Sequence, residues 1–253
     1  MNLPRFYCPE PLPAGDNRSF DLPEGPARHA ARVLRLRPGD GLVLFDGQGG
    51  QVTAAITAVV KDRVAVELGP RQPVEREARL PLTLVQALQG ADKMDFTVQK
   101  AVELGVSRIV PVSSRRSVVR LDGDRAVKRV EHWRGVAIAA CEQCGRNRPP
   151  EVAPLASLEA FLAQPAAPGS LRLMLAPDAA QALAALPPPT GEVQLLIGAE
   201  GGLAPEEMEV ARQAGFTPVR LGPRVLRTET AGLAALAAIH ALWGDFREEV
   251  EHV

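Results

Sequence analysis

The amino-terminal part of the chain carries short apolar stretches that are separated by turn residues. They lie at 41–45, 52–56 and 63–67, with glycine, aspartate and proline residues between them. Short apolar runs bounded by such residues are typical of β-strands. One helix is predicted over 26–36, because its apolar residues lie on one side and its arginines on another. The first 72 residues are therefore predicted to form a small β-rich domain.

A charged connector at 71–79 is followed by a different pattern, in which apolar runs alternate with helical periods. Runs that suit buried strands lie at 80–88, 109–112, 171–175, 193–197 and 218–221. Helical periods lie at 93–104, 125–141, 205–214 and 230–243. Strands that alternate with helices predict an α/β domain with a mainly parallel sheet over 73–253. The stretch 155–189 is rich in alanine and proline and carries no clear period.

The size and composition of the chain fit an ordinary globular protein. Its 253 residues suit one large domain or a small module plus a larger one, and 46% hydrophobic residues can fill a sizeable core. No uninterrupted apolar run reaches the about 18 residues of a membrane helix. The first 20 residues contain charges and prolines where a secretory signal needs an apolar block. We expect a cytoplasmic protein without a membrane span.

Three cysteines, Cys8, Cys141 and Cys144, are too few for a disulfide framework. The Cys141-x-x-Cys144 spacing resembles half of a zinc site, but the sequence holds no second pair or ligand cluster to complete a tetrahedron. The pattern favours incidental thiols, with a redox role as the alternative. No metal site is predicted.

The net charge of −1 conceals an uneven distribution along the chain. Residues 81–148 carry 12 Lys and Arg against 7 Asp and Glu, whereas residues 149–253 carry 6 against 13. A basic segment can track the phosphates of a nucleic acid even in a neutral protein. Solvated helix faces explain the same charges, so charge alone does not decide between the two.

The clearest signal for a ligand site is the segment 195–207. A buried strand ends at Ile197, Gly198, Gly201 and Gly202 follow, and a helix then begins. Glycines let a ligand approach the backbone closely, and loops at the carboxyl ends of parallel strands are where open α/β sheets bind ligands. The segment is neither a phosphate-binding P-loop nor a dinucleotide fingerprint. By itself, a tight strand-to-helix turn explains it equally well.

A second signal follows the next strand, in the segment 221–231. A Gly-Pro turn leads to Arg227-Thr228-Glu229-Thr230, and a nearly wholly apolar helix comes next. Thr228 or Thr230 is predicted to cap that helix. A helix that is apolar on every side must be buried, in a core or against a partner subunit. Charged residues at its start are better explained as a site than as surface.

Three further segments place polar and cationic groups at strand or helix ends. They are 89–105, where Lys100 and Glu103 share a helix face, 113–117 after a strand, and 142–146 at the end of a long helix. A surface pair between Lys100 and Glu103 contributes only about 0.2–0.5 kcal/mol. Each segment is a weak signal by itself.

Together these segments resemble the RsmE family of ribosomal RNA uridine-N3 methyltransferases, within the SPOUT superfamily. The resemblance spans nearly the whole chain, in order and spacing. The matching segments are His29–Asp40, Phe45–Gly47, Met94–Gly105, Arg115–Val119, Glu142–Arg146, Ile197–Gly202 and Leu221–Ala231. Two departures are visible: Ala199 stands where the family usually has proline, and Ala204 where it usually has a serine or threonine cap. The second departure is expected to cost about 1 kcal/mol of helix stability.

The resemblance implies a fold, a cofactor and an assembly. The expected fold is α/β, with a PUA-like RNA-binding β-barrel over 1–72. A SPOUT methyltransferase domain follows over 73–253, with a mainly parallel sheet and a deep trefoil knot. Similar proteins are homodimers and bind S-adenosylmethionine in three knot loops. The residues implied for that site are Leu175, Ala176, Pro177, Ile197, Gly198, Gly201, Gly202, Leu221, Gly222, Leu226, Thr228, Thr230 and Ala231.

The implied activity is methylation of N3 of a uridine in 16S ribosomal RNA, near its 3′ end in the decoding region of the small ribosomal subunit. Arg227 is the candidate for stabilising the charge that develops on the base carbonyls. Glu229 or Glu200 is the candidate for accepting the N3 proton. The candidate contacts to RNA are Arg28, Arg32, Lys93, Lys100, Arg115, Arg116, Gln143 and Arg146.

Two other functions stay open at this point. A related SPOUT enzyme would methylate a ribose 2′-hydroxyl or a transfer RNA, which the family-specific segment 142–146 disfavours. An RNA-binding assembly factor would lack catalysis, which the intact glycine loop and the 227–230 tetrad disfavour. A nucleotide-hydrolysing enzyme is least supported, because the sequence lacks a Walker-type lysine and metal-binding carboxylates.

Overall fold

The chain forms two compact units in a computed structural model that describes residues 3–13, 15 and 17–247. Unit 1 contains residues 1–77 and 138–149, and unit 2 contains residues 78–137 and 150–253. The chain therefore leaves unit 1 after residue 77 and returns to it at the end of a long helix, before it completes unit 2.

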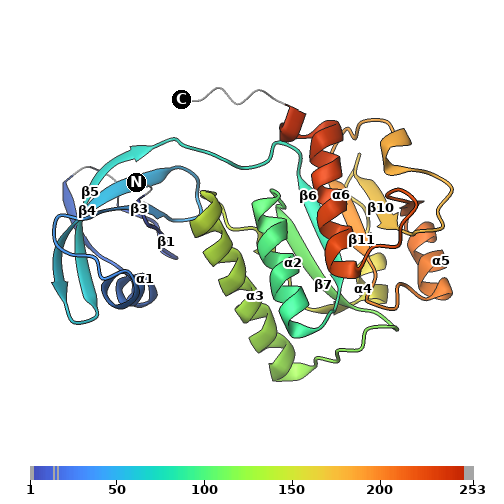
Figure 1. Ribbon diagram of the computed structural model, residues 1–253, viewed down its shortest axis with the longest axis horizontal. Helices are drawn as coiled ribbons and strands as arrows, with labels where there is room; N and C mark the ends of the chain where they lie inside the picture. Colours follow the sequence, from blue (N-terminus) through green and yellow to red (C-terminus); the bar gives the residue numbers. More distant parts are fainter. Residues whose placement is uncertain (1–2, 14, 16, 248–253) are drawn as a thin grey trace. The chain divides into compact units, whose positions relative to one another are not determined.

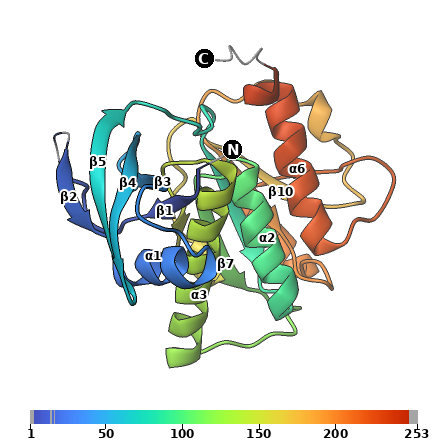
Figure 2. The ribbon, with the colours of Figure 1, turned by 60° about the vertical axis from the view of Figure 1, so that its left-hand side comes forward.

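Unit 1 is built on a five-stranded sheet in the order β1-β3-β4-β5-β2 (Figure 2). The strands are β1 (Arg5–Tyr7), β2 (Arg18–Asp21), β3 (Gly41–Phe45), β4 (Gln51–Val60) and β5 (Arg63–Gln72). β1 and β3 are parallel, and the other neighbours are antiparallel. The three strands expected from the sequence are present as β3, β4 and β5. The sequence pattern missed the two short strands at the ends of the sheet.

The one helix expected in this region is short and irregular. It consists of α1 (Glu24–Arg28) and a π-helical turn over His29–Val33. Ala27 and Ala30 lie in the core of the unit, so the apolar side of the predicted helix does face inward. The helix begins before the predicted start at 26 and ends before the predicted end at 36.

Unit 2 is built on a seven-stranded sheet in which every pairing is parallel. Its order is β12-β10-β11-β6-β7-β8, and β9 pairs with β7. The strands are β6 (Leu82–Ala87), β7 (Arg108–Ser113), β8 (Glu151–Val152), β9 (Ala156–Ser157), β10 (Leu171–Leu175), β11 (Val193–Ile197) and β12 (Thr217–Val219). β6 and β11 are buried along their whole length, as parallel strands covered on both faces must be. The predicted mainly parallel sheet is confirmed.

Helices cover both faces of this sheet (Figure 1). They are α2 (Ala91–Glu103), α3 (Gly123–Cys144), α4 (Leu158–Leu162), α5 (Pro205–Gln213) and α6 (Thr228–Trp243). Val85 of β6 lies in a core cluster with Phe161 of α4 and Ala211 of α5. Its neighbour Leu84 points to the opposite face, where it lies close to Gly232 of α6, and α2 packs against α6 there. The four long helices agree with the predicted helical periods.

The register of the central strands brings several loops to one edge of the sheet. Ile197, the last residue of β11, lies beside Gln86 of β6, and Leu175, the last residue of β10, lies beside Val219 of β12. Because the strands are parallel, the loops that follow them emerge at the same edge. The trefoil knot concerns how the chain threads through these loops, which strand order alone does not define, and it stays a prediction.

None of the described helices is both long and apolar enough to span a bilayer.

Candidate functional site

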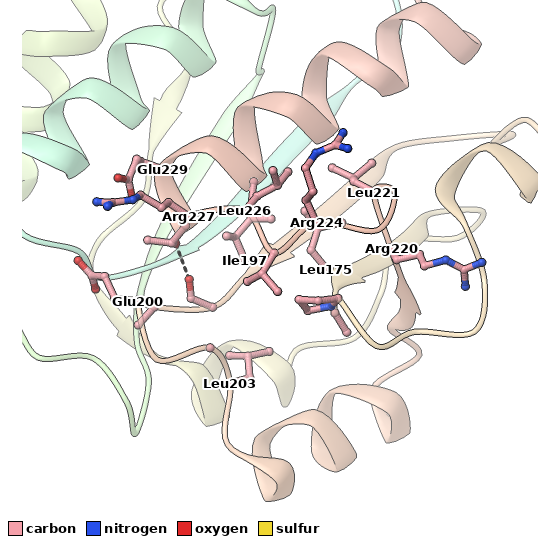
Figure 3. Close-up of a pocket in the computed structure, with 18 of the residues that line it drawn as sticks. Leu175, Ile197, Glu200, Leu203, Arg220, Leu221, Arg224, Leu226, Arg227 and Glu229 are labelled. Carbon is pink, nitrogen blue, oxygen red and sulfur yellow. Dashed lines mark hydrogen bonds between the residues drawn. The ribbon is translucent and has the colours of Figure 1, made fainter.

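A cavity of about 370 Å³ lies at the edge where β10, β11 and β12 end (Figure 3). The loops that follow these strands surround it together with the first turn of α6. A cavity of this size suits a small organic ligand. It lies entirely within unit 2.

Most residues predicted to bind the cofactor line this cavity: Leu175, Ala176, Pro177, Ile197, Gly198, Gly202, Leu221, Leu226, Thr228 and Ala231. The three candidate catalytic residues, Glu200, Arg227 and Glu229, line it as well. Gly201, Gly222 and Thr230 lie in the same segments but are not among the lining residues. Sequence reasoning did not assign Ala199, Leu203, Val219, Arg220, Arg224 or Val225 to the cavity, and it placed Lys93 among the RNA contacts instead.

The glycine loop is so tightly folded that position 198 admits no side chain. A Cβ atom on Gly198 would lie 2.8 Å from the carbonyl carbon of Gly202 and 2.9 Å from the amide nitrogen of Leu203. The loop closes on itself through a hydrogen bond of 2.8 Å from the Gly202 amide to the Ala199 carbonyl. Backbone groups rather than side chains therefore form this wall of the cavity.

The departure at Ala204 is partly offset by another residue. Ala204 is the N-cap of α5 and has no side-chain acceptor, as expected. However, Glu207 in the first turn accepts a hydrogen bond of 2.8 Å from the Ala204 amide and another of 2.8 Å from the Arg115 amide. The second half of a capping box is thus kept, and it ties the turn at 113–117 to the helix that follows the glycine loop.

The hydroxyl of Thr228 connects the glycine loop to the core. It donates a hydrogen bond of 2.6 Å to the Gly198 carbonyl and accepts hydrogen bonds of 3.2 Å from the side-chain amides of Gln86 and Gln89. All three side chains in this network are buried. The predicted cap is wrong, because Thr228 is already the first residue of α6, Arg227 is the N-cap, and no side chain caps the helix.

Arg220 fixes the loop that follows β10. Its guanidinium donates a hydrogen bond of 2.6 Å to the Ala179 carbonyl and a second one to the Ala180 carbonyl. Its backbone amide also bonds the Gln181 carbonyl at 3.0 Å. Arg220 lines the cavity, but its hydrogen-bonding capacity is directed to the protein.

The mouth of the cavity carries an ionic cluster. The ammonium of Lys93 lies 3.5 Å from Glu200 Oε1 and 3.7 Å from Glu229 Oε2. Arg227 is exposed beside it, and Figure 3 shows Arg227, Glu229 and Glu200 on the same side of the cavity, whereas the exposed Arg224 lies apart from them on the same loop. Among the described residues, neither arginine has an ion-pair partner for its guanidinium.

The pKa of Glu200 lies below its ordinary value. Burial alone would raise the pKa, but hydrogen bonds from its own amide and the Gly90 amide, together with the charge and a hydrogen bond of Lys93, outweigh it. The Gly90 amide lies 3.4 Å from Glu200 Oε1. Glu200 is therefore ionised at neutral pH and is a weak proton acceptor.

Three other predicted RNA contacts also lie in unit 2, and two of them contact the glycine loop or the helix that follows it. Arg116 donates a hydrogen bond of 2.8 Å to the Gly201 carbonyl, and Arg115 lies 3.5 Å from a carboxylate oxygen of Glu206. Lys100 forms the predicted surface pair with Glu103, at 2.7 Å. All three cations are at least partly exposed.

The remaining predicted RNA contacts lie in unit 1. Arg28 and Gln143 are exposed, and Arg32 is exposed but paired with Asp62 at 2.6 Å. Arg146 differs from these, because it is buried and its guanidinium lies 2.6 Å from a carboxylate oxygen of Glu77. Its position indicates that Arg146 holds unit 1 together.

Two of the three cysteines are buried and unreactive at neutral pH. Burial raises the pKa of both Cys8 and Cys141 to about 12, so neither is a thiolate at neutral pH. The described residues contain no cluster of three or more His, Cys, Asp or Glu side chains that could hold a metal ion.

Two family models match the chain. Residues 76–240 match an RNA methyltransferase domain, and residues 22–69 match an RNA methyltransferase PUA domain.

Two relatives that match most of the chain have the same protein name. The chain is 31% identical to ribosomal RNA small subunit methyltransferase E of Buchnera aphidicola subsp. Schizaphis graminum, over 96% of this chain and 98% of that protein. It is 34% identical to the protein of the same name from Mycobacterium bovis, over 85% of this chain and 83% of that protein.

Solved structures agree with these relatives. Ribosomal RNA small subunit methyltransferase E of Neisseria gonorrhoeae, bound to S-adenosyl methionine, has a TM-score of 0.90 at 42% identity and covers 97% of this chain and 100% of its own. A methyltransferase of Legionella pneumophila in complex with the same cofactor has a TM-score of 0.91 at 36% identity, with the same coverage.

Replacing Thr228 by valine tests whether the buried hydroxyl holds the cavity together. Thr228→Val keeps the shape but leaves a buried carbonyl and two amides without their shared partner, so the free energy of unfolding should fall by about 2 kcal/mol. Thr228→Ser keeps the hydroxyl and should lose less. Urea unfolding followed by tryptophan fluorescence reports on unit 2, because Trp133 and Trp243 both lie there. An equal fall in the free energy of unfolding in the two variants would show that the hydroxyl contributes nothing to stability.

Proposed function

Because this chain belongs to the RsmE family, the ribosomal RNA small subunit methyltransferases E, we propose that it methylates N3 of a uridine in 16S ribosomal RNA. The methyl donor is S-adenosylmethionine, and the modified nucleotide lies near the 3′ end of the RNA, in the decoding region. The observation that carries this proposal is the cavity of about 370 Å³ bounded by the glycine loop and the 221–231 segment.

The lining of the cavity fits the cofactor. Apolar side chains such as Leu175, Ile197 and Leu226 offer a surface for an adenine ring, and the glycine loop exposes backbone N–H and C=O groups for hydrogen bonds. S-adenosylmethionine supplies a methyl group made electrophilic by its sulfonium. The protein must then orient the base and help N3 lose its proton.

Arg227 is placed to stabilise the negative charge that develops on the base. It is exposed at the mouth of the cavity, one residue before α6, and has no ion-pair partner among the described residues. A guanidinium beside the carbonyl oxygens of uracil would stabilise the anion that forms when N3 is deprotonated. Arg224, on the same loop, shares this exposure and adds positive charge.

RNA would be held by exposed cationic and polar side chains in each unit. Lys100, Arg115 and Arg116 are available in unit 2, and Arg28 and Gln143 in unit 1. Arg116 contacts the glycine loop at Gly201 and Arg115 contacts Glu206 in the helix that follows it, so RNA bound there would lie near the cofactor site. Arg146 is left out of this set, because its guanidinium is buried against Glu77. A protein that acts on ribosomal RNA in this way would work in the cytoplasm.

Labelled methyl transfer to small-subunit RNA, followed by mapping of the modified nucleotide, tests this function. The wild-type chain should bind S-adenosylmethionine and place one methyl group on N3 of a uridine in the decoding region. Arg227→Ala should lower the transfer rate by about 100-fold or more while the dissociation constant of the cofactor stays within about threefold. A methyl group on a ribose or on transfer RNA would identify a related enzyme, and failure to bind the cofactor would indicate an assembly factor.

Gly198→Ala should weaken cofactor binding by at least about tenfold, because the added Cβ would force the glycine loop apart at two backbone atoms. Gly135→Ala is the matched control, since its Cβ would meet nothing within 4 Å. Calorimetric titration with S-adenosylmethionine measures the dissociation constant of the cofactor for both variants. Wild-type affinity in Gly198→Ala would mean that the tight loop is not part of the cofactor site.

The last helix provides a surface for the homodimer that we also propose. Ala234, Ala238, Ala241 and Leu242 of α6 are half-buried or exposed, although nearly all residues after the first turn of this helix are apolar. A second copy of the chain would cover this face. Light scattering on the purified protein should therefore give the mass of two chains. The mass of a single chain would contradict the dimer.

A further inference from the structure

One lysine at the mouth of the cavity is shared by two carboxylates that come from different segments. Lys93 lies in the first turn of α2, Glu200 in the glycine loop and Glu229 in the first turn of α6. The ammonium lies 3.5 Å from Glu200 and 3.7 Å from Glu229. All three line the cavity, so the cluster faces the space where the reaction would take place.

The two carboxylates are in different environments. Glu200 Oε1 has the Gly90 amide and the Lys93 ammonium within 3.5 Å, and the side chain is 32% exposed. Glu229 is 16% exposed, and its Oε2 is buried without a hydrogen-bond partner among the described residues. A buried carboxylate oxygen without a donor is costly unless a ligand supplies one. Glu229, and not Glu200, is thus the carboxylate that still needs a donor.

The hydrogen-bonding groups of uracil are complementary to the charged side chains at the mouth of the cavity. Its Watson–Crick edge presents a carbonyl acceptor, the N3–H donor and a second carbonyl acceptor. A protein reads that edge with a donor, an acceptor and a donor in the same order. Lys93 and Arg227 are donors only, and ionised Glu229 accepts only. Cytosine has an acceptor at N3 and an amino donor at C4, so two of the same three groups would oppose it with like partners.

We propose that Glu229 and Lys93 read and activate the imide edge of the target uracil. Glu229 accepts the N3 proton, and Lys93 donates a hydrogen bond to a neighbouring carbonyl oxygen of the same base. Glu200 is a positioning residue that holds the Lys93 ammonium at the mouth of the cavity. This inference rests on the function proposed above and assigns the proton acceptor within it.

The transfer balances with these groups. The N3–H bond breaks and its proton passes to Glu229. The electron pair left on N3 forms the bond to the methyl carbon. The pair of the carbon–sulfur bond stays with sulfur, and Glu229 returns its proton to water after the product leaves. Lys93 stays protonated throughout and offsets the negative charge that the base carries while N3 is deprotonated.

Single-turnover methyl transfer to small-subunit RNA lacking base methylation tests the assignment. Glu229→Gln and Lys93→Met should each lower the rate by about 100-fold. Glu200→Gln should lower it less, by about tenfold, because Lys93 is still present but less firmly held. Glu209→Gln and Lys128→Met are the matched controls: both side chains are exposed on the surface of unit 2, and both variants should keep the wild-type rate.

The pH profile separates a base from a merely structural carboxylate. Without Glu229, only uridine that has already lost its N3 proton can react, so the residual rate of Glu229→Gln should rise about tenfold for each unit of pH below the pKa of N3. The wild-type rate should be nearly flat over the same range. A residual rate that does not change with pH would overturn the role of Glu229.

Cofactor binding distinguishes this inference from the proposed function. If the wild-type chain methylates N3 but Glu229→Gln or Lys93→Met reacts within about threefold of it, the inference fails and the function stands. If either variant loses affinity for S-adenosylmethionine by more than about tenfold in calorimetry, its residue serves the cofactor and the inference also fails. If the wild-type chain neither binds the cofactor nor methylates RNA, the proposed function itself fails.

Discussion

Thr228 donates a hydrogen bond to the carbonyl of Gly198, and the candidate site depends on this contact between two loops that lie 30 residues apart in the sequence. The same hydroxyl accepts hydrogen bonds from Gln86 and Gln89, which anchors it to the end of a central strand and the start of α2. Buried polar groups must keep their partners, so neither loop can move without leaving an amide or a carbonyl unpaired. The cavity between the loops is therefore shaped before a ligand arrives, which lowers the ordering cost of binding.

The architecture of unit 2 was largely predictable because long apolar runs have few alternatives. β6 and β11 are buried on both faces, and such runs are recognisable without tertiary information. The short strands β1, β2 and β9 carry too little periodicity to be predicted. The return of 138–149 to unit 1 depends on contacts across the chain, such as the one between Glu77 and Arg146, which no local pattern records.

The candidate site shows the same limit at the level of side chains. The glycine loop was predicted as a ligand site from local backbone constraints, whereas the individual cofactor-binding residues came from the family resemblance. The structural roles of Arg146 and Arg220 were not assignable, because each depends on a partner far away in the sequence. Arg220 is engaged by carbonyls of another loop, whereas Arg227 stays exposed at the cavity mouth. The local pattern predicted Thr228 as a possible helix cap. Its hydroxyl instead bonds the Gly198 carbonyl, which belongs to a different strand–loop segment that no local pattern connects to Thr228.

Two glutamates at the mouth of the cavity show why residue identity does not define chemistry. Glu200 is held in its charged form by backbone amides and Lys93, which makes it a tether and a weak base. Glu229 lies in the more buried position and keeps an oxygen without a hydrogen-bond donor among the described residues. These different environments give the two carboxylates different roles. The protein itself provides the hydrogen-bond donors of Glu200, whereas the buried oxygen of Glu229 can obtain a donor only from a ligand. This difference in roles requires Lys93, which lies between the two carboxylates. Its ammonium holds Glu200 in place and also lies within reach of a uracil that is bound by Glu229.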